Sequence, residues 1–395
     1  MSRSARFLFV AALVVSGCDR RLVLVHELDA STLDGSASSN AFALAAGVDH
    51  TCFLSSGALY CTGHDTSGQL GFPDGVDRLV PTVVDVGTSW VALSLGYDAT
   101  CLLDVRGALS CLGDNASRQL ATGDAIARSS PTRVALARPV VSFSLRFAHA
   151  CAVLDDASLW CWGSNDEGEL GQSDGGGAAH GVPVRVSPEL SWSEASCGQG
   201  HTCAITRDGA LYCWGRNGGV LGLGPALLTE TSTPMRAGSG SWRHVVAGQN
   251  HTCGIASDGT LACWGDDSNA DGHAGPVGLP GESHTSVPTT VDGGDWATVS
   301  TDTFHTCGVR TNGELWCWGR NIEGQLGTGM LEVVDTPLRI GTDSDWARVA
   351  VGRFYTCAQK RDGSVWCTGA NDFGETGIGV IERRNVLTRI GLGTP

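Results

Sequence analysis

Residues 241–267 read SWRHVVAGQNHTCGIASDGTLACWGDD, and the same phrase, with substitutions, recurs along the chain. Its fixed point is a pair of cysteines with eight or nine residues between them, and successive pairs begin about 50 residues apart. The seven pairs are Cys52 with Cys61, Cys101 with Cys111, Cys151 with Cys161, Cys203 with Cys213, Cys253 with Cys263, Cys307 with Cys317, and Cys357 with Cys367. Self-similarity at such a period indicates a propeller or a solenoid rather than a series of unrelated domains.

Each copy contains short apolar runs that are separated by glycine and aspartate, a pattern typical of strands and tight turns. In the quoted copy the runs are 245–247, 251–256 and 261–264, and a fourth run surrounds Val291, just after Pro288. A proline also precedes the fourth run in other copies, which suits a strand start or a sheet edge. We therefore expect an all-β chain with four strands in each copy.

The turn between the two cysteines predicts the register of a hairpin. If Cys253 faces Cys263, the strands join through three residues that end in Gly259, where left-handed backbone is least costly. Opposed Cα atoms in an antiparallel pair lie about 4.5–5.5 Å apart, which is within the range that a disulfide accepts. Seven local disulfides are the favoured interpretation. Free buried thiols and a metal site are the alternatives, although zinc-binding pairs have a much closer spacing.

Charge and the N-terminus indicate the cellular compartment. The 41 acidic and 26 basic residues give a net charge of −15, and such a surface repels phosphate backbones, so nucleic acid is not an expected partner. Arg3 and Arg6 precede a nine-residue apolar run, 7–15, that suits a signal peptide and is too short to cross a bilayer. The small residues before Cys18 resemble a bacterial lipobox, which implies cleavage before Cys18 and lipidation of its thiol. An ordinary secretory signal, with Cys18 incidental, is the alternative.

These features divide the chain into a signal peptide (1–17), a tether (18–40) and a ring (41–395). The repeats of the ring are expected at 41–89, 90–139, 140–191, 192–241, 242–295, 296–345 and 346–395. Leu22–Val25 could instead form a strand that pairs with the last repeat and closes the ring. Paired cysteines agree with an oxidising, extracytoplasmic compartment. Cys197 is left over in a strand interior, where a small buried apolar residue is expected.

The order Trp, G-x-x-H-T-C, D-G-x-L-x-C-W-G, N-x-x-G-Q-L-G resembles the repeat of the regulator of chromosome condensation family. The best matches are Gly248 with His251, Trp264-Gly265 and 324–327, and the resemblance covers roughly residues 41–395. It implies a seven-bladed β-propeller of four-stranded antiparallel blades. The founding members act in the nucleus on a small GTPase and on chromatin, which an exported chain does not meet, so nucleotide exchange is not expected here. One bacterial extracellular member inhibits β-lactamase.

Two residue patterns could carry metal chemistry. His50, His149, His201, His251 and His305 recur once per copy, which predicts separated side chains that bond between blades rather than converging ligands. Residues 267–272 copy the first half of a calcium loop, with Asp267, Asn269 and Asp271 as ligands, but position twelve is Gly278 instead of glutamate. Calcium is therefore a weak alternative, and we expect no other metal and no cofactor.

Recognition is expected on the variable loops between the G-Q-L-G segment and the following proline, because binding residues concentrate on loops of rigid scaffolds. The longest loop is Gly272–Val287, and the second choice is Gln172–Val182. The candidate partner-binding residues in and beside these two loops are Asp271, His273, Glu282, His284, Asp174 and His180.

The expected function is that of a non-enzymatic, monomeric binding or scaffold propeller outside the cytoplasm, tethered to a membrane through its lipid anchor only. It would present one loop face to a protein or cell-wall partner. The alternatives are an inhibitor of a secreted enzyme, and a propeller enzyme (a lyase or a hydrolase) with its site in the central funnel. A carboxylate, a histidine and an arginine from different blades around one pocket would favour the enzyme.

Overall fold

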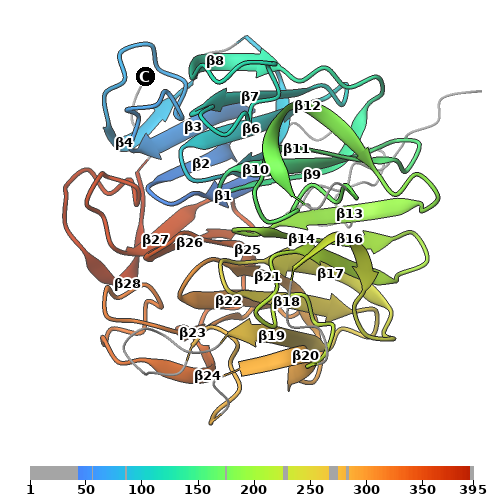
Figure 1. Cartoon of the computed structure of the whole chain (residues 1–395). Helices are drawn as coiled ribbons and strands as arrows, with labels where there is room; N and C mark the ends of the chain where they lie inside the picture. Colours follow the sequence, from blue (N-terminus) through green and yellow to red (C-terminus); the bar gives the residue numbers. More distant parts are fainter. Residues whose placement is uncertain are drawn as a thin grey trace, which may run out of the picture.

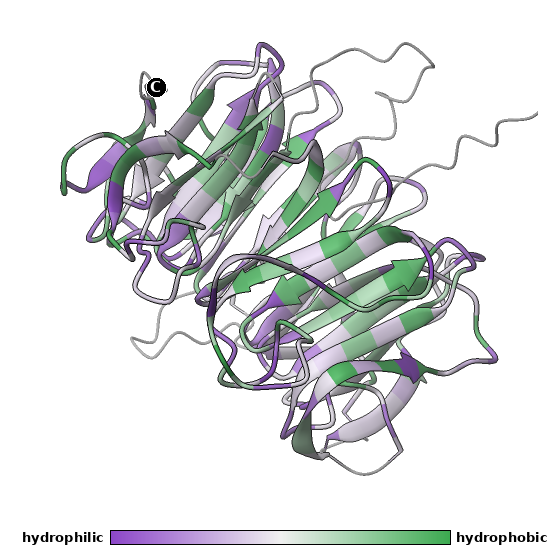
Figure 2. Ribbon diagram, turned by 90° about the horizontal axis from the view of Figure 1, so that it is seen from above, coloured by the Kyte–Doolittle hydropathy of each residue, from purple (hydrophilic) through white to green (hydrophobic). Residues whose placement is uncertain are grey.

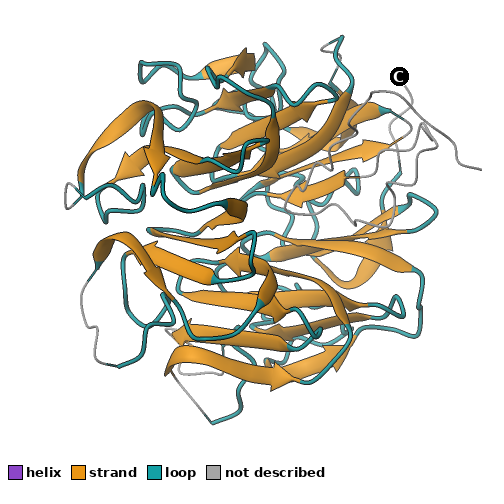
Figure 3. Cartoon of the chain, turned by 90° about the vertical axis from the view of Figure 1, so that its right-hand side faces the viewer, coloured by secondary structure: helices purple, strands orange, loops and turns teal. Residues whose placement is uncertain are grey.

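The computed structural model describes residues 43–55, 57–84, 87–173, 176–225, 230–266, 275–281 and 284–391. These residues form strands β1 to β28 in seven sheets, with no helix among them (Figure 3). Each sheet holds four consecutive strands, and every strand pairs antiparallel with its neighbour in sequence. The predicted seven-bladed β-propeller of four-stranded antiparallel blades is confirmed. The predicted signal peptide, the tether and Leu22–Val25 lie outside the described residues.

The strands run in chain order from the innermost to the outermost position of each blade. Blades 1 to 4 consist of β1 (Ala43–Ala46), β2 (His50–Ser55), β3 (Ala58–Gly63), β4 (Arg78–Val83); β5 (Trp90–Leu95), β6 (Ala99–Asp104), β7 (Leu109–Gly113), β8 (Arg128–Arg133); β9 (Val140–Arg146), β10 (His149–Leu154), β11 (Leu159–Asn165), β12 (Gly177–Val186); and β13 (Trp192–Cys197), β14 (His201–Thr206), β15 (Leu211–Gly215), β16 (Thr231–Arg236). Blades 5 to 7 consist of β17 (Trp242–Ala247), β18 (His251–Ala256), β19 (Leu261–Asp266), β20 (His284–Asp292); β21 (Trp296–Thr301), β22 (His305–Arg310), β23 (Leu315–Gly319), β24 (Val334–Arg339); and β25 (Trp346–Val351), β26 (Tyr355–Lys360), β27 (Val365–Gly369), β28 (Arg384–Arg389).

The ring closes where the last blade meets the first (Figure 1, red beside blue). Within the described residues, no strand is exchanged between these two blades. Side chains join them instead: Thr51 Oγ1 donates to the Tyr355 hydroxyl over 3.0 Å, and that hydroxyl donates to the carbonyl of His50 over 2.6 Å. The circle therefore depends on side-chain contacts at this junction.

The hairpin of each blade has the predicted register. Cys253 lies opposite Cys263, and Ala256 bonds to Thr260 across a turn whose Gly259 has φ 90°. Ala157 takes the same left-handed conformation, with φ 65°, where the other turns of this length have glycine.

The two cysteines of every hairpin lie at disulfide distance, and their Cα atoms are 4.1–4.2 Å apart. The bridges join Cys52 to Cys61, Cys101 to Cys111, Cys151 to Cys161, Cys203 to Cys213, Cys253 to Cys263, Cys307 to Cys317, and Cys357 to Cys367. The Cα separation is slightly shorter than the expected range of about 4.5–5.5 Å for opposed residues. Such pairs indicate an oxidising compartment outside the cytoplasm.

Buried tryptophans pack between neighbouring blades. Trp162, Trp214, Trp264 and Trp318 are fully buried, and each indole N–H donates to a backbone carbonyl of the preceding blade over 2.8–2.9 Å. A buried indole needs such a partner for its polar end. Figure 2 shows the result, with apolar residues along the strands and polar residues concentrated in the loops. These tryptophans are packing residues and offer no ring face to a ligand.

The repeated histidines join neighbouring blades in the same way. His50, His149, His201 and His305 bond through Nε2 to Thr100, Thr202, Thr252 and Thr356 of the next blade over 2.7–3.0 Å, and His251 bonds to Thr301 and Thr306. Thr202 Oγ1 already donates to the carbonyl of Glu169, so the imidazole is the donor. Blade 2 has Ala99 in place of this histidine, and blade 3 has Ala150 in place of the threonine. Both partners are thus absent at the same junction, where the two alanines belong to one apolar cluster.

Candidate functional site

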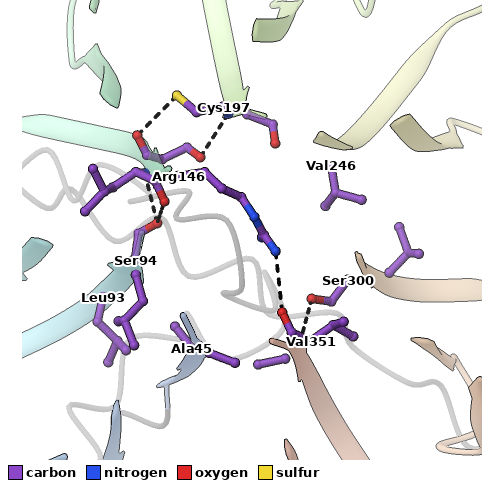
Figure 4. A pocket seen from close by; sticks show the side chains of 15 residues that line it. Ala45, Leu93, Ser94, Arg146, Cys197, Val246, Ser300 and Val351 are labelled. Carbon is purple, nitrogen blue, oxygen red and sulfur yellow. Dashed lines mark hydrogen bonds between the residues drawn. The ribbon is translucent and has the colours of Figure 1, made fainter. Parts of the chain in front are cut away.

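The innermost strands of the seven blades surround the axis of the ring. The residues opposite the first cysteine of each blade are Ala45, Ser94, Ser144, Ser196, Val246, Ser300 and Ala350, and all seven line one axial cavity (Figure 4). The cavity measures about 40 Å³, which is room for only a few water molecules. No substrate of ordinary size fits on this part of the axis.

Serines in this layer form hydrogen bonds between adjacent blades. Ser144, Ser196 and Ser300 each accept a hydrogen bond from a backbone N–H of the next innermost strand, over 2.9–3.1 Å. Ser94 receives an equivalent bond from Leu145 over 3.0 Å. The serine hydroxyls of the cavity wall are therefore already used in hydrogen bonds that join the blades.

An ion pair crosses the axis above this layer. At the end of the innermost strand, five blades have glycine: Gly47, Gly96, Gly198, Gly248 and Gly352. Blades 3 and 6 have Arg146 and Asp302 instead, and these two side chains meet over 2.8 Å. Arg146 also reaches the carbonyl of Val351 over 3.4 Å (Figure 4). The Asp302 side chain is only 3% exposed, so the pair places two opposite and largely buried charges across the axis.

A second charged pair lies on the innermost strands of two neighbouring blades, two residues before the serine layer in the sequence of each strand. His244 Nδ1 of blade 5 is 2.8 Å from Glu194 Oε1 of blade 4. Burial opposes a charged imidazole, but the Glu194 carboxylate outweighs it and raises the pKa of His244. Neither residue lines the axial cavity. The described residues contain no group of three or more His, Cys, Asp or Glu side chains that could hold a metal ion.

The histidines that bond between blades are poorly suited to proton transfer. Burial lowers the pKa of His50, His251 and His305 to about 3 and that of His149 to about 4, and it also lowers the pKa of His201. A general base works best with a pKa near the operating pH. These imidazoles therefore remain neutral and structural.

One mouth of the axis is surrounded by the inner loops, which join the innermost strand of each blade to its second strand. Their central residues are Val48-Asp49, Tyr97-Asp98, Phe147-Ala148, Gln199-Gly200, Gln249-Asn250, Thr303-Phe304 and Arg353-Phe354. No two blades share the same pair, although the residues on either side repeat. Variable loops on a rigid, repeated frame are where recognition usually occurs. The inner loops are the candidate interaction site.

On blades 6 and 7 this site is aromatic and basic. The rings of Phe304 and Phe354 stack with centroids 5.1 Å apart and planes 11° apart. The guanidinium of Arg320 lies 4.9 Å from the Phe304 ring, and that of Arg353 lies 5.0 Å from the Phe354 ring. All four side chains are partly exposed. The planar guanidinium of arginine suits such stacking on aromatic rings.

On blades 1 and 2 the site is acidic. Burial raises the pKa of Asp49, and the charge of nearby Asp98 raises it further. Burial also raises the pKa of Asp98, which accepts a hydrogen bond from Gln69 Nε2 over 3.1 Å. Burial raises the pKa of Glu375, on neighbouring blade 7, to about 7. Tyr97, beside Asp98, is 43% exposed. The mouth thus combines opposite charges on adjoining blades.

The residues predicted for binding are only partly described. Asp174, Asp267, Asn269, Asp271, His273 and Glu282 lie outside the described residues. His180 and His284 fall within strands: His180 lies opposite Gly163 in β12, and His284 opposite Asp266 in β20. The two predicted loops are therefore partly strand, because these outer strands begin before their prolines. Their sequence still varies, and they lie at the same end of the strands as the inner loops.

Cys197 is buried, and its thiol donates to the carbonyl of Ser144 over 3.4 Å. Burial raises its pKa to about 12, so the thiolate is not accessible at neutral pH. Sequence reasoning missed the inner loops and the pair of Arg146 with Asp302. The signal was present, because both sets are departures from residues that repeat in the other blades.

Comparisons with known proteins agree with this architecture. The sequence matches the Regulator of chromosome condensation (RCC1) repeat over residues 156–205, 208–255 and 312–359, and a second form of the same repeat over 141–169, 242–271 and 346–375. The chain carries RCC1 repeats. No curated protein gives a significant match to the sequence of this RCC1-repeat chain.

Solved structures share the RCC1 fold at low sequence identity. Human WBSCR16 superposes with a TM-score of 0.75 at 20% identity, over 85% of this chain and 94% of that one. Prp20p from Saccharomyces cerevisiae gives 0.73 at 17% identity, over 90% and 87%. The CRINKLY WD40 ectodomain of the Arabidopsis thaliana receptor kinase ACR4 gives 0.52 at 16%, over 90% and 98%. At these identities the likeness establishes the fold alone. Among the described residues, no helix has the length and apolarity needed to cross a membrane.

Proposed function

We propose that this chain is a non-enzymatic RCC1-type propeller, tethered to a membrane outside the cytoplasm through a lipid on Cys18. It presents its loop face, meaning the inner loops and the variable outer loops at the same end of the strands, to a protein or cell-wall partner. The observation that carries the proposal is the contrast between the axis and its mouth. The axis is crossed by the ion pair of Arg146 with Asp302 beside a cavity of about 40 Å³, whereas the mouth carries non-repeating side chains, most of them at least partly exposed.

Related structures support a protein partner. The structure of Prp20p was described together with its binding properties to Gsp1p and histones, and a further structure contains Kap60 bound to yeast RCC1 (Prp20). These are properties of that protein, but they indicate that this fold can serve recognition. For this chain, the paired cysteines and the lipobox-like sequence around Cys18 support a partner outside the cytoplasm. An inhibitor of a secreted enzyme is one form that such binding can take.

The proposal is tested by capturing partners from the cell envelope with three versions of the chain. The first is the wild type, and the second carries Arg353→Ala and Phe354→Ala, which removes the stack on the inner loops. The control is Arg106→Ala, an exposed residue in a hairpin turn at the opposite end of the strands. We expect the wild type and the control to retain the same partner and the double variant to lose at least 90% of it. Equal capture by all three, or no specific capture by any, would show that the inner loops are not a binding site.

A further inference from the structure

The outer loops of four neighbouring blades present aliphatic side chains to solvent. They belong to blades 6, 7, 1 and 2, which are consecutive around the ring because the last blade contacts the first. The residues are Met330, Leu331, Val380, Ile381, Val76 and Ile126, each 44–64% exposed, and we call them the apolar crescent. Exposed apolar patches on soluble domains commonly mark an interaction surface.

In blades 6, 7 and 2 a buried asparagine holds the crescent from beneath, whereas blade 1 has Asp65 at this position. Buried Asn321 accepts a hydrogen bond from the N–H of Leu326 over 3.0 Å, and its Nδ2 donates to the carbonyl of Met330 over 2.9 Å. Asn371 makes the equivalent bond to the carbonyl of Val380, and Asn115 donates to the carbonyls of both Asp124 and Ile126. The asparagine thus fixes the loop tip and also satisfies its backbone carbonyl. The side chains beyond it are preorganised, which lowers the entropic cost of docking.

Bonds between blades join the parts of the crescent on blades 6, 7 and 1. The N–H of Gly329 donates to the carbonyl of Asn385 in blade 7 over 2.7 Å, and Asn385 Nδ2 donates back to the carbonyl of Gly329 over 2.8 Å. The N–H of Gly379 donates to the carbonyl of Leu79 in blade 1 over 2.8 Å. The loops of blades 6 and 7 are therefore each tied to the outermost strand of the next blade. The tips of blades 6, 7 and 1 thus belong to one connected part of the surface.

In three of these loops an arginine is paired with a carboxylate of the same loop. Arg78 bonds to Asp74 over 2.9 Å, Arg128 to Asp124 over 2.7 Å, and Arg384 to Glu382 over 2.8 Å. The outer loops of these four blades together hold six carboxylates and four arginines, and Glu332 lies directly beside Leu331. Their net charge is therefore small beside the −15 of the whole chain, and the apolar tips suit an apolar partner better than an ionic one.

We propose that the apolar crescent inserts into the interface of a lipid membrane, so that the ring docks by this edge. Three observations favour lipid over protein. The tip carbonyls of Met330, Val380 and Ile126 are satisfied internally, as a hydrocarbon environment requires. The crescent is purely aliphatic, whereas protein hot spots are rich in Trp, Tyr and Arg. The 42 residues before β1 carry the signal-like and lipobox-like sequence, which brings a membrane within reach.

This inference rests on the proposed membrane tether and adds a second contact to it. A lipid anchor alone leaves the orientation of the ring free. Docking through blades 6, 7, 1 and 2 would turn the outer loops of blades 3 and 5, the two that the sequence favoured for binding, away from the bilayer. The membrane contact would then use the outer loops of four blades, whereas the proposed partner contact uses the inner loops around the axis, including those of blades 6 and 7.

The test uses vesicles and a chain without lipid. The chain from residue 18 onward, carrying Cys18→Ser, is sedimented with phosphatidylcholine vesicles. Met330→Asp with Leu331→Asp, and separately Val380→Asp with Ile381→Asp, place charge in the crescent. Val105→Asp is the matched control, because Val105 is 64% exposed but lies in a hairpin turn at the opposite end of the strands. Thermal melting establishes that each variant is folded.

We expect the wild type and Val105→Asp to bind the vesicles equally, and each double variant to bind at least tenfold more weakly. Because the chain is acidic, phosphatidylserine in the vesicles should weaken binding. The inference is overturned if the wild type does not sediment with vesicles, or if Val105→Asp loses as much binding as the double variants. It is also overturned if the crescent mediates only self-association in the absence of lipid. The envelope capture experiment is scored independently, so either proposal can fail alone.

Discussion

At the scale of single residues, a departure from the repeat can leave a buried polar atom without a hydrogen-bond partner. Five blades have asparagine at the start of the outer loop, and three of these residues, Asn115, Asn321 and Asn371, donate to a loop carbonyl. Blade 1 has Asp65, whose Oδ1 accepts the N–H of Leu70 over 2.8 Å, as these three asparagines do for their own loops. Its buried Oδ2 has no hydrogen-bond partner among the described residues and cannot donate unless it is protonated. Burial accordingly raises the pKa of Asp65 to about 6.

The raised pKa of Asp65 predicts a pH-dependent cost. Its folded pKa, about 6, lies above the ordinary aspartate value of 3.8, so the folded state binds more protons between these values, and stability falls as pH rises through this window. We expect Asp65→Asn to raise the free energy of unfolding by about 1–2 kcal/mol at pH 8 and to change it little at pH 4. Urea unfolding at both pH values measures this. The reverse change in blade 6, Asn321→Asp, should destabilise more at pH 8 than at pH 4. A pH-independent effect of Asp65→Asn would contradict the assignment.

At the scale of elements, the unit of this fold is a hairpin bridged across its two strands. Sequence spacing alone predicted it, because the turn ending in Gly259 and the opposed cysteines are local features. The first copy has a shorter turn, yet Cys52 still lies opposite Cys61. Loop length thus changes while the cross-strand pair is kept, as the sequence indicated.

Removing one bridge measures its contribution. A disulfide that closes a loop of about eleven residues contributes roughly 2–3 kcal/mol by constraining the unfolded chain, and less if the hairpin persists there. We therefore expect Cys253→Ala with Cys263→Ala to lower the free energy of unfolding by about 1–3 kcal/mol in denaturant titrations. Cys197→Ala, which removes a buried thiol and no bridge, is the control for the loss of sulfur from the core. If a thiol reductant abolishes the difference between the wild type and the double variant, the bridge is the cause. If the double variant is as stable as the wild type, the bridge contributes nothing.

At the scale of the whole molecule, period and register were predictable, and the surfaces were not. Seven copies of a local pattern determine the number of blades, because each blade is built from one continuous segment. The pairing of Arg146 with Asp302 joins positions that only the closed ring brings together. The exposure of Met330 and Ile381 likewise depends on how Asn321 and Asn371 hold their loops. Loop length, the criterion applied to the sequence, does not report which side chains remain at the surface.

The closed ring also links its stability to pH. Five histidines between blades are neutral in the fold, with pKa values lowered by burial, whereas an unfolded histidine takes up a proton near pH 6.5. The unfolded chain therefore binds more protons below that pH, and this contribution to stability is lost as pH falls. Asp65 and Glu375, with raised pKa values, act in the opposite direction. Asp65 and Glu375 are present in the wild type and in the histidine variants, so their contribution cancels when the two are compared.

His305 allows the charge and the hydrogen bond to be separated. Its Nε2 bonds to Thr356 Oγ1 over 2.7 Å, and burial lowers its pKa to about 3. Between pH 6 and pH 4, His305→Gln should reduce the slope of unfolding free energy against pH by about 1.4 kcal/mol per pH unit, because one proton fewer is taken up on unfolding. Thr356→Val removes the same bond and keeps the imidazole, so it should lower stability by about 1 kcal/mol and leave the slope unchanged. Denaturant titrations at several pH values give both quantities. Equal slopes for His305→Gln and the wild type would mean that this histidine is not held neutral by the ring.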